Sequence, residues 1–265
     1  TDPANWGVRE GYPASSDDTA VFADGAVAVI DLALGSAAGG SAKMTVGEGA
    51  NVTIKSTAQT VSGFYCYPTV GANATLTFDH VKLVFDRNKM SGYLKMSADT
   101  SCLRFVNGAE YSPAWMDPAY QSNRGLWWFE DATFDFTDGM SIGHNANLSH
   151  HDIVLVNTTA GSSLKGKNLS YQYGVTGYLY ITNSVLRMKE DAGGIINVGD
   201  WTSSGRGIVL SGDESLVSSY ILQLGKNAAL EFDYGRTDRA AFQVGVGGFA
   251  PDATAKLVVR LPKSL

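Results

Sequence analysis

The chain has 265 residues, which is enough to bury a full hydrophobic core as one large domain or two. Charged residues make up only 17%, and the formal net charge is −6 without any run of Lys or Arg. This argues against nucleic-acid binding, because phosphate recognition needs clustered positive charge. No apolar run approaches the ~20 residues of a membrane-spanning helix, so we expect no membrane partner.

The rest of the composition is typical of a β-rich, turn-rich protein, with 44% hydrophobic residues beside 30 Gly, 7 Pro and 12 Tyr. The only cysteines are Cys66 and Cys102, which could form one disulfide but match no metal-binding spacing, so we expect neither a metal nor another cofactor. The chain starts at Thr1 without a signal peptide, which fits a mature secreted product or a piece cut from a longer protein. The small polar residues favour a secreted, extracellular bacterial protein.

The opening segment is irregular around Trp6 and enters an alternating apolar pattern at Thr19, with a turn signal at Asp24-Gly25. It resembles the entry segment of secreted bacterial β-solenoids, in which a Trp and a DTAVF-like strand begin the stack. We therefore expect residues 1–20 to form an N-terminal cap, because an open stack would present unpaired strand edges.

A phrase of the form G-x-[GN]-A-x-[VL]-x-[IF] then recurs along the chain. It begins at Gly47, Gly71, Gly143 and Gly225. The first two starts are 24 residues apart and the next is 72 residues further on, three times that spacing (71 − 47 = 24, 143 − 71 = 72). A fixed period in the twenties with short strands indicates a solenoid, in which each coil buries its core only against its neighbours.

Ile54, Phe78 and Phe232 occupy one slot of this phrase, so we expect them to form one buried column. A β-sandwich would also give short strands but would not explain the spacing. No linker or composition shift divides the chain. The sequence therefore predicts an all-β, right-handed parallel β-helix, with residues 1–265 in a single domain.

The repeat is interrupted by residues 111–125, for which we expect a lateral loop. Pro113 and Pro118 bracket Trp115, so this Trp should not lie inside a regular strand. A Trp on a loop can serve recognition through its flat indole face. The alternative is that the loop folds back and Trp115 seals one end of the core.

Alternation also predicts which aromatic side chains face solvent. Tyr65 and Tyr67 alternate with Phe64 and Cys66, and Tyr93, Tyr178 and Tyr180 alternate with other apolar residues, so all five tyrosines should point outward. Of the adjacent Trp127 and Trp128, one faces inward, and the pattern does not decide which. The alternative is ordinary surface tyrosine, which sheets favour. The candidate ligand-binding residues are Trp115, Tyr120, Trp127, Trp128, Tyr93, Tyr65, Tyr67, Arg124 and Gln121.

No catalytic set emerges. Gly143-His144 with Arg187 and Lys189 resembles the GH and R-x-K elements of β-helical polygalacturonases, but no matching aspartate pair lies upstream. His144 holds a turn position of the repeat phrase, so we expect it to have no catalytic role. In His150-His151-Asp152, neighbours point to opposite faces, so at most two of the three converge and a metal site is not expected.

The length, the missing catalytic set and the aromatic loop resemble the β-helical carbohydrate-binding modules appended to xylan-degrading enzymes of gut bacteria. This resemblance implies a non-catalytic module that binds a plant cell-wall polysaccharide, β-1,4-xylan, and that is fused to a catalytic domain in its parent protein. Fold alone does not decide function. The alternatives are a β-helical polysaccharide hydrolase or lyase, and a structural passenger or adhesin segment.

Overall fold

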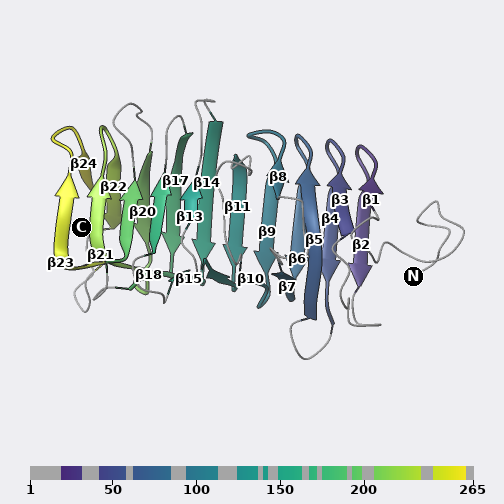
Figure 1. Ribbon diagram of the computed structural model, residues 1–265, viewed down its shortest axis with the longest axis horizontal. Coiled ribbons are helices and arrows are strands. Elements are labelled where there is room, and N and C mark those ends of the chain that lie inside the picture. Colours follow the sequence, from purple (N-terminus) through teal and green to yellow (C-terminus); the bar gives the residue numbers. More distant parts are fainter. Residues whose placement is uncertain are drawn as a thin grey trace, which may run out of the picture.

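The protein is a parallel β-helix, as the sequence predicts, and every described element of the computed structural model is a β-strand. Its strands stand side by side, from the N-terminal coil at one end to the C-terminal coil at the other (Figure 1). The structure describes residues 19–31, 42–57, 62–84, 94–112, 124–136, 140–142, 149–162, 167–171, 175–189, 193–198, 206–233 and 241–260.

One wall of the solenoid is a ten-stranded parallel sheet that extends over the whole described length. Its strands, in spatial order, are β2 (Val27–Asp31), β4 (Asn51–Lys55), β6 (Thr75–Asp79), β9 (Cys102–Val106), β11 (Gly125–Glu130), β14 (Ser149–Val156), β17 (Val175–Thr182), β20 (Arg206–Ser211), β22 (Ala229–Asp233) and β24 (Lys256–Arg260). The spatial order of these strands follows their order along the chain.

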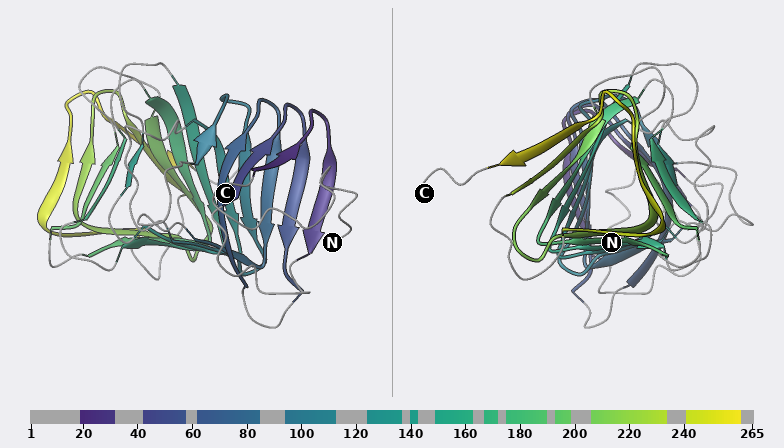
Figure 2. Two further views of the ribbon diagram at one scale, coloured as in Figure 1. Left: turned by 45° about the vertical axis from the view of Figure 1, so that its right-hand side comes forward. Right: turned by 90° about the vertical axis from the view of Figure 1, so that its left-hand side faces the viewer.

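The other two walls belong to a 14-stranded sheet, so that the coil is triangular when viewed end-on (Figure 2). β5 and β21 bend from one wall into the other: the first half of β5 pairs with β7, and its second half pairs with β3 and β8. The strands are β1 (Thr19–Phe22), β3 (Ala42–Val46), β5 (Ser62–Val70), β7 (Val81–Val84), β8 (Lys95–Met96), β10 (Glu110–Ser112), β12 (Thr133–Asp135), β13 (Met140–Ile142), β15 (Thr159–Ser162), β16 (Asn168–Tyr171), β18 (Val185–Met188), β19 (Ile195–Val198), β21 (Leu216–Leu224) and β23 (Phe242–Pro251).

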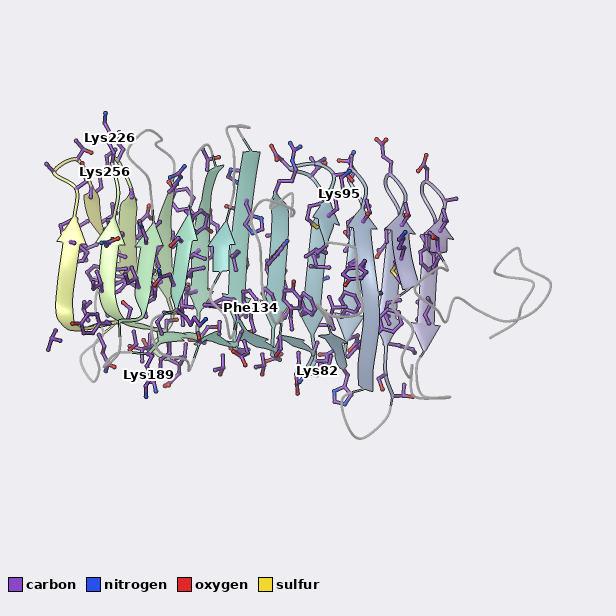
Figure 3. All side chains as sticks on the ribbon, viewed as in Figure 1. Lys82, Lys95, Phe134, Lys189, Lys226 and Lys256 are labelled. Atoms are coloured by element: carbon purple, nitrogen blue, oxygen red, sulfur yellow. The ribbon has the colours of Figure 1, made fainter. Side chains whose placement is uncertain are left out.

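The core consists of inward side chains stacked from coil to coil. Ile54 pairs in register with Phe78, and the same column also contains Phe232, so the predicted shared slot is confirmed. Between them, Phe105 and Phe129 lie with ring centroids 4.9 Å apart and planes 5° from parallel. Figure 3 shows Phe134 inside the coil, while the labelled lysines project outward. The full column is Ile30, Ile54, Phe78, Phe105, Phe129, Leu155, Ile181, Leu210, Phe232 and Val259.

The third copy of the repeat phrase was aligned wrongly. The phrase beginning at Gly143 puts Asn147 in the slot of Asn51, whereas the register passes from Asn51 through Thr75 and Cys102 to Leu126 and then Asp152. The coils differ in length, so the spacing of 72 residues was coincidental. His144 itself lies outside the described residues, and its predicted role stays a prediction.

One corner of the coil depends on side chains that tolerate the left-handed backbone region. His80, Asn107, Asp131, Asn157 and Asn183 each follow a strand of the ten-stranded sheet and have φ between 46° and 55°. Asn and Asp adopt this conformation at lower cost than most residues. Inside the same corner Thr158 Oγ1 donates to Val156 O at 2.8 Å, and Ser184 Oγ accepts from Thr158 N at 2.9 Å. Neighbouring coils are thereby linked at the turn.

The two cysteines are free thiols. Cys66 is buried, and Cys102 lies on the outer side of β9. Burial raises the pKa of the Cys66 thiol far above its usual value, so it stays protonated.

Candidate functional site

The outer side of the ten-stranded sheet carries a central column of side chains that we call the outer strip. Its members alternate with core residues: Trp128 lies between the buried Trp127 and Phe129, and Tyr180 between the buried Leu179 and Ile181. The register therefore settles which of the adjacent tryptophans faces outward. In spatial order the outer strip is Arg104, Trp128, Val154, Tyr180, Val209 and Glu231.

Trp128 is held at its polar edge. Its Nε1 donates to Glu130 Oε2 at 3.0 Å, and the same carboxylate lies 3.5 Å from Arg104 Nη2. The Arg104 guanidinium carbon is 5.8 Å from the centroid of the indole ring, within cation–π range. The hydrogen bond to Glu130 and the contact with Arg104 restrict the rotation of the half-buried Trp128 ring. A ligand that binds to this ring would therefore cost less side-chain conformational entropy.

Tyr178 and Tyr180 form an aromatic pair on β17. Their ring centroids are 5.9 Å apart at an interplanar angle of 38°, and Tyr180 is 36% exposed. Tyr178 packs over Gly207 of the next strand: a Cβ at that glycine would lie 2.6 Å from Tyr178 Cε1. Partial burial, with the nearby Asp152 carboxylate, raises the pKa of Tyr180, so its hydroxyl stays a hydrogen-bond donor.

Trp128 and Tyr180 lie in one column with a single strand between them. Val154 of β14 pairs in register with both. Two strand spacings put the two backbone positions about 10 Å apart along the solenoid axis. With Val209 beyond Tyr180, the middle of the outer strip is apolar over four successive strands, with Arg104 before it and Glu231 after it.

A polar cluster borders the outer strip at the start of the same strands. Arg124 Nε donates to Asp99 Oδ1 at 2.9 Å, and His150 N donates to the same oxygen at 3.2 Å. Burial raises the pKa of Asp99, but the hydrogen bonds from Arg124 and His150 outweigh it and hold that pKa below its usual value. The side chain of His150 is bonded to Asp152 Oδ2 at 2.9 Å and to Thr176 Oγ1 at 3.1 Å.

This cluster offers donors and acceptors for hydroxyl groups, and also a chain of groups in the order Thr176, His150, Asp152. That order is used for nucleophilic catalysis, in which a histidine activates a hydroxyl. Asp152 has a structural task as well, since its Oδ1 accepts from Tyr178 N at 2.9 Å. His151, in contrast, is fully buried, which confirms that at most two members of His150-His151-Asp152 converge.

Two predicted ligand-binding residues are buried, and the predictions for them were wrong. Trp127 is 0% exposed because it faces into the coil, edge-on to Tyr111 at 5.9 Å and to His151 at 5.0 Å. Tyr67 is 7% exposed. In the strand register Tyr67 lies beside Lys43, whose side chain faces outward, so the predicted outward direction of Tyr67 is correct. The outer side of β5 is nevertheless buried at this point.

The remaining predicted residues divide into two groups. Trp128 does face outward, and Arg124 lies in the polar cluster. Trp115, Tyr120, Gln121, Tyr93 and the side chain of Tyr65 lie outside the described residues. Of the predicted lateral loop, Tyr111 belongs to β10 and is buried, and Gly125 begins β11.

The members of the site that sequence reasoning missed are Tyr178 and Tyr180. Their outward direction could be predicted from the alternation with Leu179 and Ile181 and is confirmed. What the alternation could not supply is the register, which brings Tyr180 two strands from Trp128 although the two are far apart in the chain.

Comparison with known proteins gives no relative: no protein-family model, no curated protein and no solved structure matches this chain. Within the described ranges there is no helix long and apolar enough to cross a membrane. The same residues contain no group of three or more His, Cys, Asp or Glu side chains that could hold a metal ion.

Proposed function

We propose that this protein is a non-catalytic carbohydrate-binding module that holds a linear polysaccharide along the outer strip. The observation that carries the proposal is the shared column of Trp128 and Tyr180, with Val154 between them. Pyranose rings present apolar C–H faces, and exposed indole and phenol rings offer flat apolar surfaces of similar size.

The spacing of the two rings supports an extended chain lying along the solenoid axis. About 10 Å between Trp128 and Tyr180 is close to the length of a disaccharide unit, so alternate sugars would rest on the two rings. Val154 would contact the sugar between them. Arg104 at one end of the strip, and Glu130 and Asp152 beside it, can bond hydroxyl groups.

Within this class we propose β-1,4-xylan of the plant cell wall as the ligand and an extracellular parent enzyme as the source of the module. An extended, uncharged chain fits the apolar middle of the strip better than a polyanion does, because the protein carries a formal net charge of −6.

The test is the affinity for soluble xylan of Trp128→Ala, Tyr180→Ala and the double variant, measured by calorimetry or affinity electrophoresis. Each ring contributes on the order of 1 kcal/mol, so each single variant should bind about fivefold more weakly and the double variant roughly ten- to a hundredfold more weakly. Thr53→Ala is the matched control, since Thr53 lies in the same outward column, two strands before Arg104. A double variant that melts normally and binds xylan like the unaltered chain would exclude the outer strip as the site.

A second candidate is hydrolysis, favoured by the hydrogen-bonded chain Thr176, His150 and Asp152. Release of reducing sugar or of esterified acid from xylan, lost in His150→Ala while binding persists, would favour this function. A binding module should release neither product.

A further inference from the structure

Strand β17 places two aromatic side chains on the outer face, one in the outer strip and one beside it. Tyr180 belongs to the strip, and Tyr178 precedes it by two residues on the same strand. Two residues along a strand span about 6.6 Å, and the strands run across the long axis of the solenoid (Figure 1). The two ring centroids are 5.9 Å apart, so the rings lie side by side across the direction of the strip.

The Tyr178 ring lies against the sheet because the next strand has a glycine beside it. Gly207 of β20 is the register partner of Tyr178 and holds an outward position, yet it is buried. A Cβ at this glycine would lie 2.6 Å from Tyr178 Cε1 and 2.8 Å from Tyr178 Cδ1. The ring therefore covers the space that a side chain at position 207 would fill, and it does not project freely into solvent.

The aromatic surface is widened at this strand only. Among the described strands from β9 to β22, Tyr178 is the one aromatic residue in the two outward columns that border the outer strip. On the opposite side of Tyr180, the corresponding residue of β17 is Thr182. The surface thus has a second ring on one side of the strip and at one level of it.

A linear polysaccharide along the outer strip would leave this second ring uncovered. A pyranose ring is similar in size to one aromatic ring, so a backbone sugar above Tyr180 does not also cover Tyr178. A sugar that branches from this backbone unit would lie to the side of the chain, above the Tyr178 ring.

We propose that the site takes a substituted polysaccharide, in which the backbone sugar on Tyr180 carries a single neutral sugar branch that rests on Tyr178. This inference rests on the proposed function, since it requires a chain that lies along the outer strip. It adds the class of polysaccharide, one with single-sugar branches.

The polar groups around Tyr178 favour a neutral branch over an acidic one. Asp152 precedes Tyr178 in the same outward column, and its Oδ1 accepts a hydrogen bond from Tyr178 N at 2.9 Å. A carboxylate on the branch would lie beside this carboxylate, which is unfavourable. Beyond Tyr178, on the side away from the strip, Thr176 Oγ1 and His150 Nδ1 lie 3.1 Å apart, where they can bond hydroxyl groups of the branch.

The test is calorimetry with three xylan pentasaccharides: one unsubstituted, one with an arabinosyl group on the central sugar, and one with a glucuronosyl group there. Two sugars on each side of the central one allow the chain to reach Trp128 in either direction. The unaltered chain should bind the arabinosyl pentasaccharide about fivefold more tightly than the unsubstituted one, because one further ring is stacked. The glucuronosyl pentasaccharide should bind more weakly than the arabinosyl one.

Three variants assign this preference to the ring. Tyr178→Leu keeps an apolar side chain over Gly207 but offers no flat face, so the two affinities should become equal. Tyr178→Phe keeps the ring and should keep the preference. Thr182→Ala, on the opposite side of Tyr180, is the matched control and should also keep it. Melting curves check that the variants are folded.

Two results would overturn this inference and leave the proposed function standing. One is that the unaltered chain binds the unsubstituted and the arabinosyl pentasaccharides equally well, and the other is that Tyr178→Leu keeps the preference. A glucuronosyl pentasaccharide that binds more tightly than the arabinosyl one would overturn the neutral character of the branch. If none of the three pentasaccharides binds, the proposed function fails and this inference fails with it.

Discussion

At the scale of single residues, His151 shows how the coil accommodates a polar ring in its interior. Its register neighbours are Gly125 on one side and Gly177 on the other, so neither neighbouring position carries a side chain that would stack on the imidazole. Gly177 has a φ of 129°, and a Cβ there would collide with the His151 carbonyl. The ring instead packs against the Trp127 indole, with the ring planes at 90°. The corresponding slots of other coils hold Ala50, Ala74 and Ala228.

This buried ring predicts a pH-dependent stability. Burial lowers the pKa of His151 to about 4, whereas the ring in the unfolded chain titrates near pH 6.5. Between these values the unfolded chain binds a proton that the folded chain does not. The free energy of unfolding should therefore decrease as the pH falls from 6.5 towards 4, by up to about 3 kcal/mol from this residue.

The measurement is urea unfolding at several pH values for the unaltered chain, His151→Phe and His150→Gln. His151→Phe should lose this part of the pH dependence, because the phenyl ring binds no proton. His150→Gln should keep it, since His150 is exposed on the outer face. Equal pH slopes for His151→Phe and the unaltered chain would show that the imidazole is not excluded from water.

At the scale of elements, the corner after each strand of the ten-stranded sheet sets the direction of the next wall. Asn157 follows β14 with a φ of 48°, and its N donates to Thr182 O of the next coil at 3.0 Å. A β-branched residue is strained in this region of backbone conformation. Asn157→Val should therefore lower the free energy of unfolding by about 1–3 kcal/mol, while Asn157→Gly should change it much less.

The matched control is Asn51→Val, because Asn51 is exposed in the extended strand β4, where a β-branched residue is favoured. Thermal or urea unfolding of the three variants checks the prediction. If Asn157→Val were as stable as Asn51→Val, the corner would not depend on the left-handed conformation.

The same elements show how far sequence reasoning reaches. Alternation predicted the inward column of Ile54 and Phe78, because a period of two is set by the strand itself. It could not set the register between coils, which depends on turn lengths that vary along the chain, and so the phrase at Gly143 was misplaced. A column of Asn and Asp at the corner, including Asn107, Asp131 and Asn157, was an available signal for the true register. The side chain of Trp127 points into the coil and that of Trp128 points outward. Only the register with Leu103 and Arg104 decides which of the two is buried.

At the scale of the whole molecule, the solenoid converts one outward side chain per coil into a continuous surface. The outer strip runs from β9 to β22. The rings and methyl groups of its apolar part, on β11, β14, β17 and β20, come from residues that the sequence spreads over several coils. Its charges stand only at the two ends, as Arg104 before the apolar part and Glu231 after it. A ligand that contacts the middle of the strip therefore meets little net charge.

This arrangement predicts that binding of a neutral polysaccharide depends little on salt. Stacking on Trp128 and Tyr180 is not screened by ions, whereas attraction between exposed charges is largely lost beyond a Debye length of about 10 Å at 0.1 M salt. The dissociation constant for xylan should change less than about twofold between low salt and ~0.5 M salt. Polygalacturonate, a polyanion, is the comparison: the net charge of −6 should oppose its binding at low salt and oppose it less as salt rises. A steep loss of xylan affinity with salt would instead indicate that charged groups such as Arg104 and Arg124 dominate the contact.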